Sequence, residues 1–217
     1  MGYRMQIKFD VKTIIFILIF LILKKEDIYL IFLIYAIVHE LIHVITGIVL
    51  GMKPHVLNIM PFGASISFKE DINSYNKKII RGNVNNIKRL LIAITAPLFN
   101  IVLGTLFSFN SKYILITYIN IILALFNLLP IYPLDGGRII KEILTILYGR
   151  RKALEYINTI SNITLTIICI FCIIFCYMSR SILLLISIIY LIYIRRKENQ
   201  IYRIRKRVYV ILEKSEY

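Results

Sequence analysis

The chain has 217 residues, of which 59% are hydrophobic and only 18% are charged, whereas soluble domains average about 45–50% apolar and about 25% charged residues. This excludes an ordinary soluble domain, and the long apolar runs favour membrane-spanning helices over the alternating pattern of barrel strands. The net charge of +15 is spread over several short loops, which membrane topology explains more simply than nucleic-acid binding. We therefore expect an all-α polytopic membrane protein.

Six apolar segments are the candidate transmembrane helices. The first is short, but it is not a cleavable signal, because charged residues rather than a small-residue cleavage site follow it at 24–27. The expected spans are residues 11–23, 28–50, 88–109, 113–129, 158–178 and 181–194. They define a membrane domain at 1–194, followed by a basic, Tyr-rich cytosolic tail at 195–217 that we expect to lie along the membrane surface.

The second span carries a His-Glu-x-x-His motif inside an otherwise apolar run. His39 and His43 are four residues apart, so on a helix both imidazoles lie on one face and can reach a single metal ion. Glu40 is then placed to take a proton from a water that the metal activates. The alternative is two buried histidines satisfied by their neighbours. We favour the metal site, because polar side chains inside a bilayer are costly and tend to be functional.

The stretch between the second and third spans is too broken for a spanning helix. Residues 56–68 mix β-prone residues with Pro61 and Gly63, which predicts a strand pair or a re-entrant loop, followed by a solvated stretch. His55 lies at the start of this region. It is either a third metal ligand or a surface histidine, and the second interpretation is favoured because nothing pairs with it at a ligand spacing.

Other polar residues inside the spans have a structural alternative. Pro97 in the third span frees backbone groups that neighbouring helices must satisfy. Asn100, one turn later, either points at the active site or only bridges helices. Cys169, Cys172 and Cys176 share one face of the fifth span. We interpret them as apolar packing residues rather than as metal ligands, because cysteine packs as a small hydrophobic side chain.

A turn rich in proline and glycine interrupts the helical pattern after the fourth span. Pro130, Pro133 and two glycines stop regular helix around Asp135, and a short helix is expected at 139–149. A catalytic zinc takes three protein ligands. Asp135 is the best third ligand, because the other acidic residues apart from Glu40 fall in loops, tails or the flank of a helix. The alternative is that Asp135 caps the helix that follows.

The distribution of basic residues predicts the topology. Of the 27 Lys and Arg residues, 23 lie in the N-terminus, the tail and the loops at 51–89 and 138–152. The positive-inside rule then places both termini in the cytosol. In this topology His39 and Asp135 both belong to the cytosolic half of the bilayer.

These motifs resemble those of the site-2 protease family of intramembrane zinc metalloproteases. The matching residues are His39-Glu40-Leu-Ile-His43 and the run from Asn127 to Gly136. With Met60-Pro61-Phe62-Gly63, they are most similar to the stage IV sporulation protein FB subfamily, over most of residues 5–212. The resemblance implies a zinc metalloendopeptidase, with one Zn²⁺, that cleaves a membrane-tethered protein near the cytosolic face.

The resemblance also implies finer properties. Asn127 would help to position the substrate strand, with Pro130, Pro133 and Asn100 as further substrate-binding candidates, and the loop at 56–68 would pair with the substrate. The substrate would be the precursor of a late sporulation sigma factor in the mother-cell membrane around the forespore, and partner membrane proteins would inhibit the enzyme. The chain stops about where the subfamily's nucleotide-sensing CBS domain would begin, so regulation by ATP through such a domain is not expected.

Two other functions compete with the protease. A zinc- or proton-linked transporter would need polar residues along a path on several helices, but here they cluster at one depth. An inactive scaffold of the same fold would have lost the glutamate or a ligand, whereas His39, Glu40, His43 and Asp135 are all present.

Overall fold

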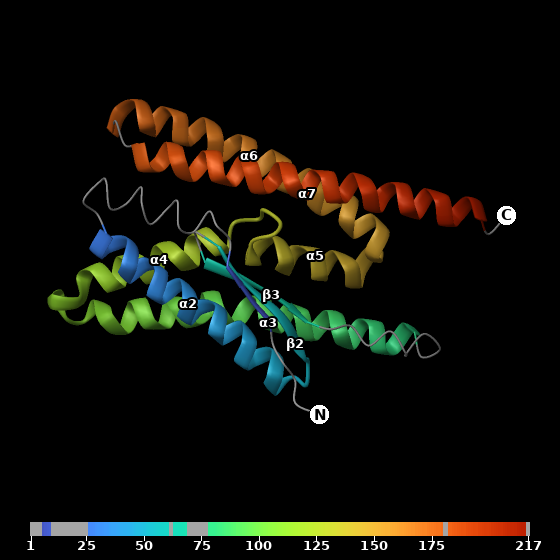
Figure 1. Ribbon diagram of the computed structural model, residues 1–217, viewed down its shortest axis with the longest axis horizontal. Helices are drawn as coiled ribbons and strands as arrows, with labels where there is room; N and C mark the ends of the chain where they lie inside the picture. Colours follow the sequence, from blue (N-terminus) through green and yellow to red (C-terminus); the bar gives the residue numbers. More distant parts are fainter. Residues whose placement is uncertain (1–5, 10–25, 61–62, 69–77, 180–181, 216–217) are drawn as a thin grey trace. The chain divides into compact units, whose positions relative to one another are not determined.

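The computed structural model describes residues 6–9, 26–60, 63–68, 78–179 and 182–215. The chain divides into two compact units, Met1–Asn127 and Leu128–Tyr217 (Figure 1). The first unit carries the His-Glu-x-x-His motif, and the second begins with the turn that leads to Asp135.

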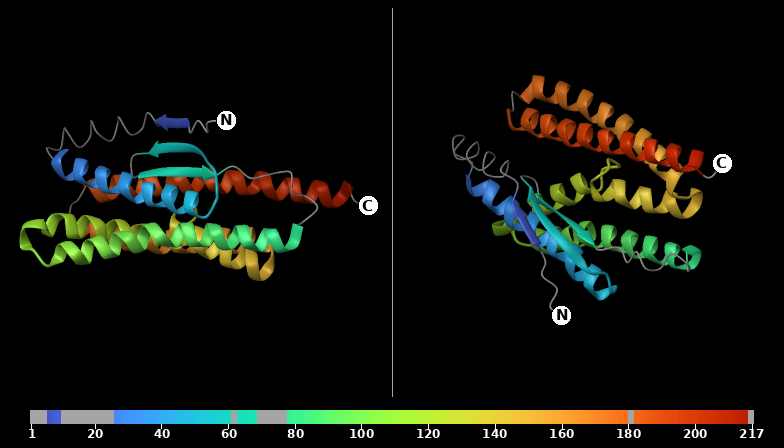
Figure 2. Two further views of the ribbon diagram at one scale, coloured as in Figure 1. Left: turned by 90° about the horizontal axis from the view of Figure 1, so that it is seen from below. Right: turned by 45° about the vertical axis from the view of Figure 1, so that its right-hand side comes forward.

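In the described part of the first unit, three α-helices accompany a small sheet. Helix α2 (Glu26–Val49) packs on α3 (Lys78–Ser108), and α3 packs on α4 (Ile114–Asn127), which follows a short 3₁₀ helix (Figure 2). Small residues allow α3 and α4 to approach closely, since a Cβ at Gly104 would lie 2.8 Å from the Ile121 side chain. The buried apolar core of this unit includes Ala96, Leu123 and Ala124.

Helix α2 ends in a glycine cap that its sequence encodes. Gly51 has φ +73°, a left-handed conformation that costs glycine little. Its N–H donates to the Ile48 carbonyl at 2.9 Å, and the Met52 N–H donates to the Gly47 carbonyl at 2.8 Å. These two hydrogen bonds form a Schellman motif, which satisfies carbonyls at the end of the helix that carries the histidines.

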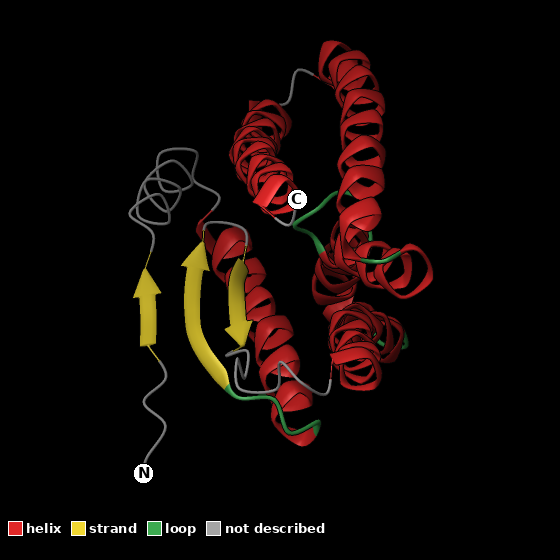
Figure 3. Cartoon of the chain, turned by 90° about the vertical axis from the view of Figure 1, so that its right-hand side faces the viewer, coloured by secondary structure: helices red, strands yellow, loops and turns green. Residues whose placement is uncertain are grey.

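A three-stranded sheet lies against α2. Strands β2 (Pro54–Met60) and β3 (Gly63–Phe68) pair antiparallel, where the sequence predicts a strand pair or a re-entrant loop. Strand β1 (Gln6–Phe9) adds parallel to β2, in a part of the chain for which the sequence predicts no strand. The strand order is β1-β2-β3, and β3 contacts α2 (Figure 3).

The second unit is a helical stack. Helix α5 (Asp135–Tyr148) packs on α6 (Arg150–Ser179), which packs on α7 (Ile182–Ser215). The buried guanidinium of Arg195 joins α7 to α6: its Nε donates to Asn162 Oδ1 at 2.8 Å and its Nη2 donates to Asn158 Oδ1 at 2.7 Å. Figure 2 shows α6 and α7 side by side.

Three described helices overlap expected spans. Within the described residues, three helices are long and apolar enough to cross a membrane, with a shorter apolar helix at Ser111–Asn127. The three are Asp27–Val49, Val84–Ser108 and Arg150–Phe175, which overlap the predicted spans at 28–50, 88–109 and 158–178. The span expected at 11–23 lies outside the described residues. Helix α7 covers the span expected at 181–194 and continues unbroken to Ser215, through most of the predicted tail.

Candidate metal centre

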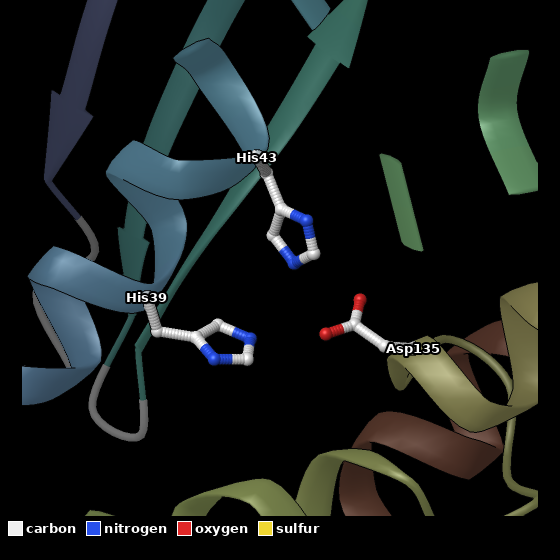
Figure 4. A group of neighbouring side chains, drawn as sticks. All are labelled: His39, His43 and Asp135. Atoms are coloured by element: carbon white, nitrogen blue, oxygen red, sulfur yellow. The ribbon is translucent and has the colours of Figure 1, made fainter. Parts of the chain in front are cut away.

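Helix α2 presents two histidines on successive turns. His39 and His43 are each only 2% exposed, in spite of lying on a helix whose other faces are largely apolar and exposed. Their ring centroids are 5.0 Å apart and their planes are nearly perpendicular, at 89°. Figure 4 shows both imidazoles projecting from the same side of the helix, as the four-residue spacing predicts.

The neighbouring helix α3 fixes the orientation of one of these rings. The Nδ1 atom of His43 lies 2.7 Å from the carbonyl oxygen of Ile92. A carbonyl can only accept, so Nδ1 carries the proton and Nε2 is left with its lone pair for a metal. Thr95 Oγ1 donates to the same carbonyl at 2.9 Å and accepts from Thr46 Oγ1 at 3.1 Å. Metal-ligating histidines usually have such an outer hydrogen bond.

Asp135 is the first residue of α5 and is buried, with 4% of its surface exposed. Its Oδ1 atom lies 3.4 Å from Nη1 of Arg138, one turn later. The N-cap position belongs to Leu134, with no side-chain capping bond. Asp135 therefore does not occupy the capping position that was the alternative to a metal ligand, and α5 begins four residues before the helix expected at 139–149.

These three residues form a group that could hold a metal ion. One ligand atom from each of His39, His43 and Asp135 lies within 4.8 Å of the others, and all three residues are buried (Figure 4). Two imidazole nitrogens and a carboxylate oxygen are a ligand set that zinc accepts in catalytic sites, with a fourth position left open. The donor atoms fit the metal that the sequence predicts.

The first turn of α5 lies too close to the preceding turn for side chains at two of its positions. A Cβ at Gly136 would overlap the backbone of Leu128, and a Cβ at Gly137 would overlap the backbone of Tyr132. The start of α5 thus lies directly on the main chain of the preceding turn. Both glycines are required by this close approach rather than by an unusual φ angle.

The predicted substrate-binding residues lie in different surroundings. Asn127 ends α4, and its Nδ2 donates to the Leu123 carbonyl at 3.0 Å. Pro130 and Pro133 are half-buried in the turn before Asp135. Asn100 is fully buried in α3, and neither atom of its amide has a hydrogen-bond partner among the described residues. Glu40, the predicted base, is half-buried next to His39.

Several other residues singled out in the sequence are not part of this group. His55 belongs to β2, but its side chain is outside the described part of the structure, as is that of Cys176. Cys169 and Cys172 are half-buried on α6. Glu142, which sequence reasoning set aside with the acids on helix flanks, is buried inside α5 with 5% exposure and pairs with Lys141 at 3.2 Å.

The chain is similar to known proteases. The model of Peptidase family M50 matches residues 108–171, a region that contains Asp135 and the turn before it. A zinc metalloprotease of Methanocaldococcus jannaschii is 26% identical over 129 residues, which are 54% of this chain and 34% of that protein. The solved site-2 protease from Methanocaldococcus jannaschii superimposes with a TM-score of 0.67 at 21% identity, over 89% of this chain and 90% of that one.

The chain therefore has the fold of a site-2 protease, and the predicted fold class of a helical membrane protein is confirmed. The resemblance to this family, expected from two short motifs, is supported by the family model, the curated relative and the solved structure. The aligned region spans about a third of the length of the curated relative, at 34%.

Proposed function

We propose that the chain is an intramembrane zinc metalloendopeptidase that cleaves a membrane-tethered protein. The observation that carries the proposal is the buried group of His39, His43 and Asp135 in a chain with the site-2 protease fold. Burying polar side chains inside a membrane protein costs free energy, so a buried polar group of this kind is expected to have a function.

His39, His43 and Asp135 would hold the zinc ion. The hydrogen bond from His43 Nδ1 to the Ile92 carbonyl leaves Nε2 as the ligand atom. When bound, zinc lowers the pKa of a water molecule and polarises the scissile carbonyl. The other protein groups bind the substrate, exclude bulk water and move protons.

Glu40 is the proposed general base and acid. It follows His39 directly on α2, and it is the acidic residue of the motif that is not a proposed ligand. Its carboxylate takes a proton from the attacking water and then gives a proton to the leaving amine. A carboxyl group in this role contributes about 10²- to 10⁴-fold to the rate.

Strand β3 is the proposed docking edge for the substrate. A transmembrane helix hides its peptide bonds, so the substrate must unwind locally before it is cut. In the described sheet β3 pairs with β2 on one side, and its other edge can accept an added strand. Asn127, Asn100 and the prolines Pro130 and Pro133 would contact the unwound segment, and of these Asn100 offers a buried amide.

The proposed biological setting follows from the sequence motifs. The stage IV sporulation protein FB-like motifs suggest the precursor of a sporulation sigma factor as substrate, in the mother-cell membrane, with inhibitory membrane-protein partners. The concentration of Lys and Arg in alternate loops supports cytosolic termini and a cut near the cytosolic face. Regulated intramembrane proteolysis would then release a soluble transcription factor.

Co-expression of the chain with candidate membrane-tethered transcription factors tests the proposal. The intact chain should shorten one of them, and the Glu40→Gln form should not, because it retains the ligands but lacks the base. Zinc bound by both forms, measured on the purified proteins, separates loss of chemistry from loss of metal. Equal cleavage by both forms would refute the role of Glu40, and zinc binding with no cleavage of any candidate would favour the inactive scaffold.

A further inference from the structure

The turn that carries Asp135 is tied to a distant helix by one hydroxyl group. Ser161 lies in α6 and is fully buried, with 0% of its surface exposed. Its Oγ accepts a hydrogen bond from the backbone N–H of Tyr132 at 2.9 Å, across 29 residues of sequence. Tyr132 stands three residues before Asp135.

The remaining backbone bonds of this turn are local. The N–H of Ile131 donates to the Leu129 carbonyl at 2.7 Å, and the N–H of Leu134 donates to the Ile131 carbonyl at 2.8 Å. Among the described residues, the bond to Ser161 is the backbone hydrogen bond of residues 128–134 that reaches another helix. Local bonds set the shape of a turn, but only a contact outside it can set its position.

The start of α5 transmits that position to the carboxylate. The backbone of Tyr132 lies where a side chain at Gly137 would be, so the turn and the first turn of α5 move together. The Lys141 ammonium, one turn further along α5, lies 5.4 Å from the centre of the Tyr132 ring. A shift of Tyr132 would therefore move Asp135 as well.

We propose that Ser161 is a positioning residue that holds the Tyr132 main chain, and through it Asp135, in the geometry that a metal ligand requires. This inference rests on the proposed zinc protease. Outer partners that orient a ligand usually act on the side chain itself, whereas Ser161 acts on the main chain three residues away. Nothing in the sequence around Ser161 signals this role, because it lies among other hydroxyl and amide residues, such as Thr159 and Asn162, and belongs to no motif.

The test compares Ser161→Ala with Thr159→Val in the purified full-length chain. Thr159 is a matched control, because it is a hydroxyl residue on the same helix whose Oγ1 donates only to the Glu155 carbonyl of α6, at 3.1 Å. Cobalt(II) serves as a coloured probe of the site. Ser161→Ala should bind cobalt about 10-fold more weakly than wild type, with an altered visible spectrum, a lower kcat and an unchanged KM. Thr159→Val should match wild type, and Ser161→Thr, which keeps the oxygen, should restore the spectrum.

Amide exchange supplies a second readout, and its wild-type half does not depend on a folded variant. In the wild-type chain without metal, the Tyr132 amide should be protected from deuterium exchange, and in Ser161→Ala it should exchange faster. A Tyr132 amide that is unprotected in wild type would overturn the inference, and so would a Ser161→Ala protein with wild-type cobalt affinity and spectrum. If wild type itself bound no cobalt, the metal centre and the proposed function would fail together with the inference.

Discussion

Glu40 is the side chain on which the proposed chemistry depends. Changing it to glutamine removes the proton acceptor while keeping the size of the side chain, so cleavage should fall by about 10²- to 10⁴-fold. Zinc content should stay near one ion per chain, because the proposed ligands are His39, His43 and Asp135. Cleavage of a tethered substrate and zinc content by elemental analysis check the two halves of this prediction. Loss of zinc together with activity would instead make Glu40 part of the metal-binding set.

Asp135 and Glu142 give a matched pair of buried acids on α5, at 4% and 5% exposure. Asp135→Ala should weaken zinc binding by more than the roughly 10- to 100-fold that loss of an outer partner costs. Glu142→Gln should bind zinc as wild type does, because Glu142 pairs with Lys141 and is not in the group that could hold a metal. Zinc competition with a chelating dye measures both affinities. Unchanged affinity in Asp135→Ala would mean that the third ligand is another residue.

Sequence reasoning selects the proposed metal ligands but not the groups that hold them in place. The four-residue spacing of His39 and His43 and the scarcity of intramembrane acids were enough to select Asp135. The Ile92 carbonyl and the Ser161 hydroxyl could not be selected, because each acts through the main chain in a contact between helices. Every residue has a carbonyl, so only the packing of α3 on α2 identifies the one that matters.

At the scale of elements, the first turn of α5 lies directly against the backbone of the turn that precedes it. Gly137→Ala places a methyl group on the backbone of Tyr132, which should cost about 1–3 kcal/mol of unfolding free energy and weaken zinc binding. Gly149→Ala is the control: it is strained by φ +79°, but nothing lies within 4 Å of its Cβ. It should lose stability without losing zinc affinity. Thermal unfolding in detergent and zinc titration separate the two effects.

Helix α7 carries a charged group that should make stability depend on pH. Burial raises the pKa of the Glu198 carboxyl, although the nearby Arg205 and Arg195 oppose the rise. With its folded pKa above the unfolded one, this group stabilises the fold below its unfolded pKa, and that stability is lost as the pH rises through the folded pKa. Glu198→Gln should therefore raise the melting temperature at pH 7 and have little effect at pH 4.

Glu155 provides the control for this prediction. It is an acid on the neighbouring helix α6 whose side chain is 45% exposed, and it pairs with Lys206 at 3.4 Å. An exposed ion pair contributes little, so Glu155→Gln should leave the melting temperature nearly unchanged at both pH values. A Glu198→Gln protein that melts below wild type at pH 7 would show that the charged carboxylate stabilises α7.

The helix and strand boundaries show where the local sequence was sufficient for prediction and where contacts between distant residues decided the structure. The expected end of the second span at residue 50 was accurate to one residue, because Gly51 marks the helix cap in the sequence itself. The start of α5 was expected four residues too late, because two glycines are poor helix formers unless a close contact requires them. Strand β1 was missed because its parallel partner, β2, lies about fifty residues away.

At the scale of the whole molecule, the surface is that of a protein surrounded by lipid. Large apolar side chains are widely exposed on the long helices, among them Ile45, Leu106 and Phe171. Exposed apolar area of this extent marks a membrane or protein contact surface. Together with the three helices long enough to span a bilayer in the described part of the chain, it agrees with a multi-pass membrane protein.

The predicted topology can be tested with reporter fusions. Alkaline phosphatase folds only in the oxidising space outside the cytosol, so a fusion after Asn110, between α3 and α4, should be active. A fusion after Ser215, at the end of α7, should be inactive, because both termini are predicted to be cytosolic. Activity of the second fusion and not the first would reverse the orientation of the chain.

The contact between His43 and the Ile92 carbonyl determines which kinds of mutation can test this part of the protein. All twenty amino acids bring a backbone carbonyl oxygen to position 92, so substituting the Ile92 side chain, which is itself buried at 6% exposure, changes the packing there without removing the oxygen. Inserting one residue into α3 ahead of position 92 is different, because it rotates everything beyond it by about 100°. Length changes, rather than substitutions, are what would expose this part of the centre.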